Sequence, residues 1–278
     1  MPELPEVQAH AERLDRQFAG HALERFVPFN FTALKTAVPR PDQAYGLPMV
    51  GVGRRGKYLL LRFEPVVFVV HLMQGGRLLV DDKLSLKPRN GQARFLFTDG
   101  PALLLTEAGT ERRAGVWCVA PDALNGPPLH RLGPDALDIS AEQLAARFAE
   151  HNMRLHGFLR DQHAIAGLGR MLANEVCHRA KLSPFAMTGK LGTPGALLVH
   201  EAIHACVDDG LTYERTRTDM SSSADRPGAV HGRAGQACPV CSDTIRAVSY
   251  SGYTVAYCPT CQTSGKVLAD NTTSKFLK

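Results

Sequence analysis

Two cysteine pairs, Cys238-Pro239-Val240-Cys241 and Cys258-Pro259-Thr260-Cys261, decide the fold of the C-terminal part of the chain. Paired thiolates at this spacing suit a tetrahedral zinc ion held at the tips of two hairpin turns. Because four thiolates leave no coordination position open, the sequence predicts one structural Zn²⁺ bound by Cys238, Cys241, Cys258 and Cys261. Two disulfides are the alternative, and they fit poorly with a cytoplasmic chain.

Length and composition limit what the rest of the chain can be. At 278 residues and 44% hydrophobic content it is long enough for two modest domains besides the cysteine module. It has neither an apolar run of membrane-spanning length nor a signal-peptide pattern, so we expect a cytoplasmic protein that uses no membrane. The three other cysteines, Cys118, Cys177 and Cys206, also favour a reducing compartment. A net charge of +5 is compatible with nucleic-acid binding but is weak evidence by itself.

The first part of the chain reads as one helix followed by strands. Pro5 to Phe18 has helical periodicity, with Val7, Ala11, Leu14 and Phe18 on one face. Short strand-like runs then follow at 58–63, 66–72, 95–97 and 103–105, separated by Pro, Gly and Asp. No helical unit alternates with them, so an antiparallel sandwich or barrel is favoured over a parallel sheet.

The second part reads as helical. Residues 121–139 are rich in Pro and Gly and are interpreted as a linker between a sandwich domain, 1–120, and a helical domain, 140–220. Ser140 and Gln143 predict a capping box, and helices are expected over 153–163, 171–179 and 196–207. Residues 216–235 predict a mobile loop, and 231–278 hold the cysteine module and a tail. The predicted fold class is therefore α+β with several domains.

His200-Glu201-Ala202-Ile203-His204 matches the H-E-x-x-H pattern of zinc proteases. A catalytic zinc needs a third protein ligand, and the extended form of the pattern would place it at 210. That position is Gly210, and the segment otherwise resembles an ordinary packed helix. The metalloprotease hypothesis is kept only as a minor alternative.

Three short segments could contact phosphate. Gly53-Arg54-Arg55-Gly56-Lys57 and Thr110-Glu111-Arg112-Arg113 are basic turns, although such a turn alone is more typical of a solvated loop. In Ala166-Gly167-Leu168-Gly169-Arg170 a tight turn runs into a helix, whose exposed amides and N-terminus suit an anion. Each signal is weak when taken separately.

The chain start, Met1-Pro2-Glu3-Leu4-Pro5-Glu6, has a chemical possibility of its own. If the initiator Met is removed, Pro2 carries a secondary α-amine with a pKa near ~8. Such an amine is a nucleophile toward an electrophilic carbon, and two carboxylates lie close by in sequence. An amide nitrogen at Pro2 could not do this chemistry.

Together these motifs resemble the Fpg/Nei family of bifunctional DNA glycosylases over nearly the whole chain. The matching segments are Pro-Glu-Leu-Pro-Glu-Val at 2–7, Gly56-Lys57-Tyr58, the helix–two-turns–helix motif from 159 to 175, and the cysteine module with 231–233 before it. The resemblance implies a monomeric base-excision repair enzyme that binds damaged double-stranded DNA. It also implies that Pro2 attacks C1′, that Glu3 transfers protons, that Glu6 orients the N-terminal segment and that Lys57 grips a phosphate.

The expected DNA contacts depart from the family pattern. The resemblance implies a wedge residue that fills the gap left by a flipped-out nucleotide, and this position holds Gln74 where Fpg has Met. The basic turn at 110–115 keeps Arg112 and Arg113 but has Ala114 in place of an intercalating Phe. Arg170 stands where the family has a phosphate-binding Asn, and Tyr253 replaces a phosphate-binding Arg of the zinc hairpin. Because Tyr253 supplies no charge, we expect a weaker grip by the hairpin. These changes leave open a second hypothesis, a lesion-binding or abasic-site-binding DNA protein with weak or no catalysis.

Overall fold

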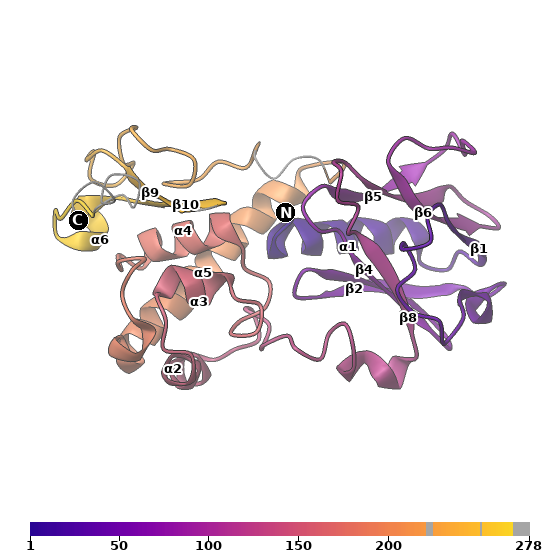
Figure 1. Ribbon diagram of the computed structural model, residues 1–278, viewed down its shortest axis with the longest axis horizontal. Coiled ribbons are helices and arrows are strands. Elements are labelled where there is room, and N and C mark those ends of the chain that lie inside the picture. The colour runs from indigo at the N-terminus through magenta and orange to yellow at the C-terminus, as the bar shows by residue number, and fades with distance from the viewer. Residues whose placement is uncertain (221–224, 251, 269–278) are drawn as a thin grey trace. The chain divides into compact units, whose positions relative to one another are not determined.

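A computed structural model of the chain describes residues 1–220, 225–250 and 252–268. Residue contacts divide these into two compact units (Figure 1). The first holds residues 1–131 and 211–220, and the second holds 132–210 with the described residues from 225 to 268. The domain boundaries drawn from the sequence at 120, 139 and 220 stay predictions, and residues 221–224 of the predicted 216–235 loop lie outside the described residues.

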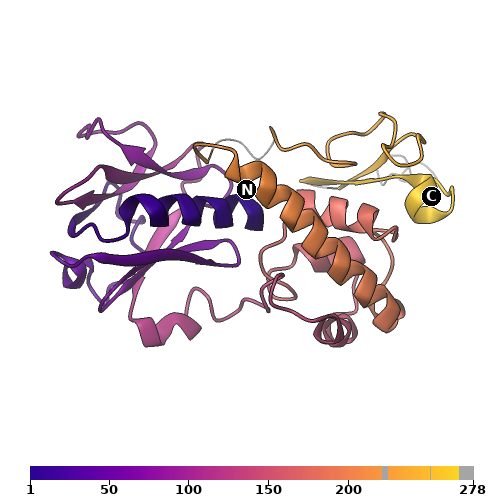
Figure 2. The same ribbon diagram turned by 180° about the vertical axis from the view of Figure 1, so that it is seen from behind.

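Helix α1, Leu4–Phe18, opens the first unit and runs alongside its strands (Figures 1 and 2). Its predicted apolar face is confirmed, because Val7, Ala11, Leu14 and Phe18 are all buried in the core. The helix starts one residue earlier than predicted, so Pro5 occupies its second position, where the missing N–H is still tolerated. Burial of the apolar face holds the helix in place and so positions the residues before it.

Two four-stranded antiparallel sheets complete the first unit. The first sheet has the order β1 (Leu23–Pro28), β6 (Gly91–Phe97), β7 (Ala102–Glu107), β5 (Gly76–Asp81). The second has the order β2 (Met49–Arg55), β3 (Tyr58–Phe63), β4 (Val67–His71), β8 (Gly115–Val119). Every pairing between these eight strands is antiparallel, and buried residues of both sheets share one hydrophobic core with α1. The predicted antiparallel sandwich is confirmed.

The second unit is helical, with a β-hairpin and one short helix near its C-terminal end. Its elements are α2 (Ala141–Glu150), α3 (Leu155–Arg160), α4 (Arg170–Arg179), α5 (Gly192–Arg215), β9 (Arg246–Tyr250), β10 (Tyr253–Tyr257) and α6 (Pro259–Thr263). The last turn of α5 is counted with the first unit. The capping box is confirmed: the Ser140 N–H donates to Gln143 Oε1 at 2.9 Å, and the Gln143 N–H donates to Ser140 Oγ at 3.2 Å. None of the helices in the described part of the chain could cross a lipid bilayer.

The H-E-x-x-H segment lies on α5. The His200 and His204 rings are 4.6 Å apart between centroids, and Ala202 and Ile203 are buried. Among the described residues, no cluster of metal-ligand atoms includes these two histidines. The metalloprotease hypothesis therefore lacks the third ligand that a catalytic zinc requires.

Buried His10 on α1 makes stability depend on pH. His10 is 4% exposed, and its Nε2 lies 2.7 Å from the carbonyl oxygen of Leu78. Burial, aided by the charge of Arg13, lowers the pKa of His10 from 6.5 to about 4. Between these two values the unfolded chain takes up a proton that the folded chain does not, so stability falls as the pH falls. At pH 5 the loss is roughly 2 kcal/mol relative to pH 7.

We therefore expect the unfolding free energy of His10→Gln to fall about 2 kcal/mol less than that of the parent protein between pH 7 and pH 5. Urea titrations followed by the fluorescence of Trp117, the single tryptophan, would measure it. The exposed His130→Gln is the matched control and should behave like the parent protein. Equal falls in the parent and in His10→Gln would show that His10 carries no such linkage.

Candidate functional site

The first residues of the chain are buried in the first unit. Pro2 is buried, and Glu3 and Glu6 are 5% and 2% exposed. The backbone N–H of Glu3 donates a hydrogen bond to Oε2 of Glu6 at 3.0 Å. Because Glu3 is the N-cap of α1, this bond fixes the direction in which the Pro2–Glu3 peptide leaves the helix.

Lys57 joins this group from the β2–β3 turn, where Gly56 has a φ of 57°. Lys57 is only 5% exposed, so the solvated-loop interpretation of this basic turn is wrong for Lys57. The pKa of the Met1 α-amine is lowered, mainly by burial, and Glu3, Glu6 and Lys57 are among the charges that act on it. The structure thus gathers two carboxyl groups and one ammonium group around the amine end of the chain.

Two further residues belong to this group, and sequence reasoning missed them. The ring of His71, at the end of β4, lies 4.4 Å from the Tyr58 ring, and burial and then the charge of Lys57 lower the pKa of His71 to about 4. His71 is therefore neutral at pH 7. The guanidinium of Arg77 on β5 acts on the Met1 amine and on Glu6. The available signal was their position, since both flank the Leu72–Gly76 turn at the ends of apolar runs.

The predicted wedge, Gln74, lies exposed in the turn between β4 and β5. A cavity of about 210 Å³ adjoins this turn and the β7–β8 loop, and Gln74 and Arg113 both line it. Arg112 and Arg113 are exposed on that loop, where Arg113 is ion-paired. Ala114 is fully buried, and its backbone N–H is bonded within the protein at 2.6 Å. The residue at the Phe position therefore belongs to the core and offers nothing to a partner.

Arg170 and Tyr253 both reach the surface of the second unit. Arg170 is the first residue of α4 and is exposed, while Tyr253 opens β10 and is partly exposed. The turn before α4 is held by Gln162, which accepts a hydrogen bond from the Gly167 N–H at 3.0 Å and donates one to the Leu168 carbonyl at 2.8 Å. The prediction of exposed amides is thus wrong for Gly167, while Arg170 is exposed at the N-terminus of α4 and can contact an anion.

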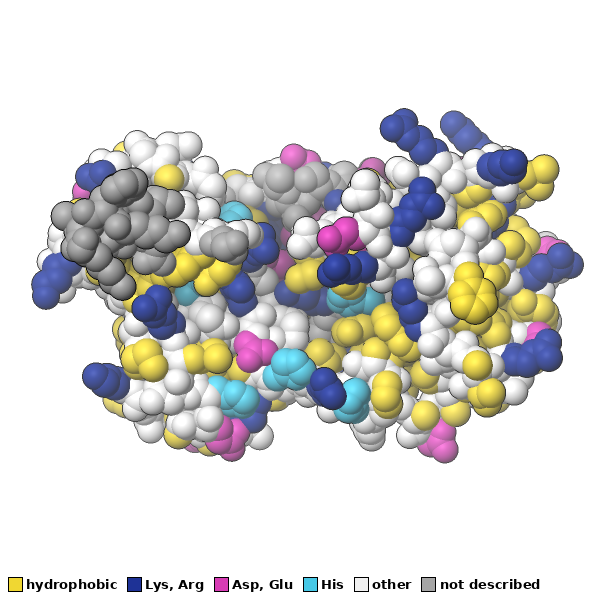
Figure 3. Space-filling model, in the orientation of Figure 1, with side chains coloured by type: hydrophobic (Ala, Val, Ile, Leu, Met, Phe, Trp, Pro, Cys, Tyr) yellow, Lys and Arg dark blue, Asp and Glu magenta, His cyan; other side chains and the backbone are white. Residues whose placement is uncertain are grey.

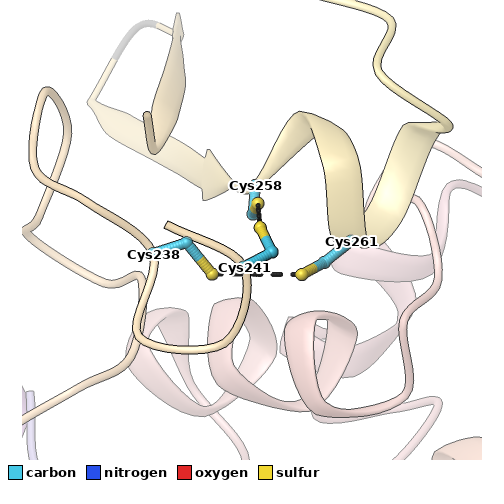
Figure 4. Close-up of side chains that lie close together, drawn as sticks. All are labelled: Cys238, Cys241, Cys258 and Cys261. Carbon is cyan, nitrogen blue, oxygen red and sulfur yellow. Dashed lines mark hydrogen bonds between the residues drawn. The ribbon is translucent and has the colours of Figure 1, made fainter. Parts of the chain in front are cut away.

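The four predicted metal ligands converge in the second unit. Figure 4 shows Cys238 and Cys241 in a loop, with Cys258 and Cys261 at the start of α6, and all four sulfurs directed toward one another. The sulfur atoms lie within 4.8 Å of one another. The Cys241–Cys258 and Cys238–Cys261 sulfur distances are 3.3 and 3.9 Å, far too long for disulfide bonds.

These distances fit a tetrahedral metal ion. With Zn–S bonds of about 2.3 Å, sulfur atoms at the corners of a tetrahedron are roughly 3.8 Å apart. His178 supports the set from α4, with its Nε2 3.3 Å from the Cys238 sulfur, as is usual for groups around metal thiolates. The cluster can therefore hold a metal ion, and its closed donor set suits a structural ion.

One face of α4 fixes the cysteine module. The Asn174 side chain contacts Nδ1 of His231 at 2.7 Å and accepts a hydrogen bond from the Ala256 N–H at 3.2 Å. The Glu175 carboxylate accepts three backbone N–H bonds, at 2.7, 3.0 and 2.8 Å, from Ala229, Val230 and His231. His178 lies one turn further along α4. Together these side chains hold both the segment before the first cysteine pair and the β9–β10 hairpin.

Removing the Glu175 carboxylate should loosen the segment that leads into the module. Glu175→Ala is expected to lower the unfolding free energy by about 3 kcal/mol, because three backbone donors lose a charged acceptor. Hydrogen exchange at Ala229, Val230 and His231 would report it directly. Glu175→Gln keeps one acceptor oxygen, and since Oε1 serves Val230 and His231, those two amides should stay protected while Ala229 exchanges. Unchanged exchange in Glu175→Ala would contradict this account.

Comparison with known proteins settles the family. Residues 1–117 match the family model of the formamidopyrimidine-DNA glycosylase N-terminal domain, and residues 132–222 match that of the formamidopyrimidine-DNA glycosylase H2TH domain. The chain is 32% identical to the formamidopyrimidine-DNA glycosylase of Symbiobacterium thermophilum, covering 94% of this chain and 89% of that one. The chain belongs to the formamidopyrimidine-DNA glycosylase family. Membership places it among DNA glycosylases, which are DNA-binding proteins of DNA repair.

Other relatives agree. The formamidopyrimidine-DNA glycosylase of Desulforamulus reducens is 30% identical, over 94% of this chain and 99% of its own. An uncharacterized formamidopyrimidine-DNA glycosylase-like protein of Mycobacterium tuberculosis is 42% identical over 154 residues, which are 55% of this chain and 98% of that protein. The Lactococcus lactis glycosylase, solved with DNA that contains an abasic site, has the same fold: its TM-score is 0.83 at 20% identity, over 94% of this chain and 99% of that one.

Proposed function

We propose that this protein is a bifunctional DNA glycosylase and AP lyase, which removes a damaged base through an iminium link between Pro2 and the sugar and then cuts the strand. The observation that carries the proposal is the burial of Glu3, Glu6 and Lys57 around the amine end of the chain. Charged side chains are rarely buried unless they are paired, and titratable groups in perturbed surroundings gather at catalytic sites.

The surroundings favour an amine that reacts as a nucleophile. Burial lowers the pKa of the Met1 α-amine. Pro2 is buried as well, so an amine at Pro2 would be desolvated in the same way, which increases the uncharged fraction that can attack carbon at neutral pH. Once Met1 is removed, the amine is that of Pro2. Glu6 keeps the Glu3 N–H bonded and so holds the Pro2–Glu3 peptide in one direction.

The chemistry then proceeds in balanced steps. The Pro2 nitrogen forms a bond to C1′ as the bond from C1′ to the base breaks; the nitrogen loses its proton and the leaving base takes one up. The nitrogen lone pair next expels the ring oxygen O4′, which receives a proton from the Glu3 carboxyl, and an iminium results. The Glu3 carboxylate accepts the C2′ proton, and the 3′ phosphate leaves. Elimination of the 5′ phosphate can follow, and water releases Pro2 from the sugar.

The remaining predicted residues bind DNA in this scheme. Lys57 grips a phosphate beside the lesion, and Gln74 fills the gap left by the extruded nucleotide. Arg112 and Arg113 contact the region opposite the lesion, and Arg170 contacts a phosphate. The four cysteines hold one Zn²⁺, which supplies folding energy to the hairpin module. Figure 3 shows Lys and Arg side chains exposed on the face drawn, as suits a polyanionic ligand.

The lesion is proposed to be an oxidised base or a bare abasic site. The Lactococcus lactis enzyme was solved with DNA that carries an abasic site or an oxidised pyrimidine, and a mutant of it was solved with DNA that carries a Fapy-dG. Because Ala114 is buried and Gln74 replaces the Met wedge, a preference for 8-oxoguanine opposite cytosine is not part of the proposal.

Borohydride trapping tests the function. The purified protein is incubated with duplexes that each carry one oxidised base or an abasic site, with and without borohydride. We expect a nicked strand without borohydride and a covalent protein–DNA adduct with it, for at least the abasic duplex. Binding of these duplexes without nick or adduct on any of them would overturn the proposal and leave a lesion-binding protein.

A further inference from the structure

Two tyrosines form an aromatic platform on the zinc hairpin. Tyr250 and Tyr253 are cross-strand partners at the turn end of the hairpin, where β9 ends and β10 begins. Their rings are stacked, with centroids 4.9 Å apart and ring planes 11° from parallel. Both side chains are partly exposed. Stacked rings of this kind are rigid, because each ring restricts the rotation of the other. The platform can therefore hold a flat group in a defined place.

The flat group that it holds is the guanidinium of Arg160. The Arg160 Cζ lies 3.9 Å from the centre of the Tyr253 ring, a close cation–π contact. Among the described residues no carboxylate lies within ion-pair distance of Arg160. Its Nη1 is buried without a hydrogen-bond partner, while the side chain as a whole is partly exposed. Stacking thus fixes the position of the guanidinium while its charge is left without a counter-ion in the described structure.

More positive charge surrounds this pair. Arg154 donates a hydrogen bond from Nη1 to the Tyr250 hydroxyl at 2.9 Å. His156 stacks on Tyr253 with centroids 6.0 Å apart, and its pKa is lowered to about 3, by burial first and then by the charges of Arg160, His231 and Arg170. Because His156 is neutral at pH 7, the charge on this surface comes from arginines.

We infer that Arg160, positioned by Tyr253, is a phosphodiester-binding residue of this protein, and that Arg154 extends the site along the Tyr250–Tyr253 platform. An arginine that lies flat on a ring still presents N–H donors at its edge, in a geometry that matches phosphate oxygens. The ligand is the backbone of DNA, so the inference rests on the proposed function. It also revises the expectation from the sequence: Tyr253 adds no charge itself, but it positions a charge contributed by α3.

The salt dependence of DNA affinity tests this site. We expect Arg160→Leu to weaken binding of an uncleavable abasic-analogue duplex roughly tenfold. The slope of log K against log salt is negative, and its magnitude should decrease by about 0.9, the value for one lost phosphate contact. Arg179→Leu is the matched control: it removes one exposed arginine of the same unit that already pairs with Asp209, and it should leave the slope unchanged.

Variants of Tyr253 test the positioning role. Tyr253→Phe keeps the ring and should retain both affinity and slope, whereas Tyr253→Leu should lose affinity although no charge is removed. Arg160→Lys keeps the charge without the flat stack and should bind several-fold more weakly than the parent protein, with the slope largely kept. Thermal melts of each variant separate lost binding from lost folding, and the Phe and Lys variants make the smallest changes to packing.

The outcomes separate this inference from the proposed function. If the parent protein nicks and traps DNA while Arg160→Leu and Arg160→Lys both keep parental affinity and slope, the inference fails and the proposed function stands. If no DNA is nicked or trapped but the slope still depends on Arg160, the phosphate site stands and the proposed chemistry fails. Equal binding by Tyr253→Phe and Tyr253→Leu would remove Tyr253 from the site.

Discussion

Glu3→Gln is expected to lower the single-turnover rate of base excision by about 10²- to 10⁴-fold, the range for loss of a general acid–base group. The amide has the shape of the carboxyl group but can neither give a proton to O4′ nor take one from C2′. The backbone N–H of residue 3 can still bond to Glu6, so the N-terminal segment keeps its direction. Affinity for an abasic-analogue duplex should therefore change little. Quenched-flow assays on a lesion that the parent protein excises would measure the rate.

Glu12→Gln is the matched control on the same helix. Glu12 lies on α1 and is ion-paired with Arg215 at 2.7 Å, away from the N-cap, so its loss should alter excision by less than about threefold. An excision rate for Glu3→Gln within threefold of the parent rate would show that Glu3 is not the proton-transfer group.

The second large effect is expected for the cysteine set. Cys238→Ala leaves three thiolates and should abolish stoichiometric zinc, with the loss of folding energy of order ~10 kcal/mol from the module. The small apolar cluster of Val230, Ile245 and Ala256 with two of the cysteines cannot replace that energy. We expect rapid proteolysis within residues 229–268 and a large loss of DNA affinity. Metal analysis and peptide mapping would measure both effects.

Two controls sharpen this prediction. His200→Ala alters the H-E-x-x-H segment and should keep one zinc per chain, while Cys206→Ala removes a buried cysteine outside the cluster and should keep it as well. Full zinc content in Cys238→Ala, or loss of zinc in His200→Ala, would contradict the four-cysteine assignment.

Local sequence patterns predicted much of the fold, because apolar periodicity and turn residues determine where helices and strands begin and end. The strand at 58–63 is confirmed to the residue, since its apolar run is bounded by a glycine turn and a proline. The helix predicted over 196–207 continues to Arg215 as α5. The apolar pattern stops at 207 because Asp208-Asp209-Gly210 interrupts it. Buried Leu211 and the hydrogen bond at 2.9 Å from Arg13 to the Glu214 carbonyl hold that extension, and sequence periodicity carries no trace of such distant contacts.

The site was only partly predictable for the same reason. Spacing alone indicated the four cysteines, whereas the burial of Lys57 follows from the packing of α1 and the strands and could not be told from a solvated basic turn. The partnership of Arg160 with Tyr253 joins two elements far apart in sequence. From the sequence alone, Tyr253 indicated only the loss of a positive charge at that position. Its contact with the Arg160 guanidinium is visible only in the structure.

Mapping the trapped adduct tests the central claim most directly. The protein is reduced with borohydride on an abasic duplex, digested with nuclease and protease, and the peptide that carries the sugar remnant is sequenced by mass spectrometry. The account predicts that the remnant is on the nitrogen of Pro2, in a chain that lacks Met1. A remnant on Nζ of Lys57, the buried amine of the same site, or on the amine of a retained Met1, would contradict it.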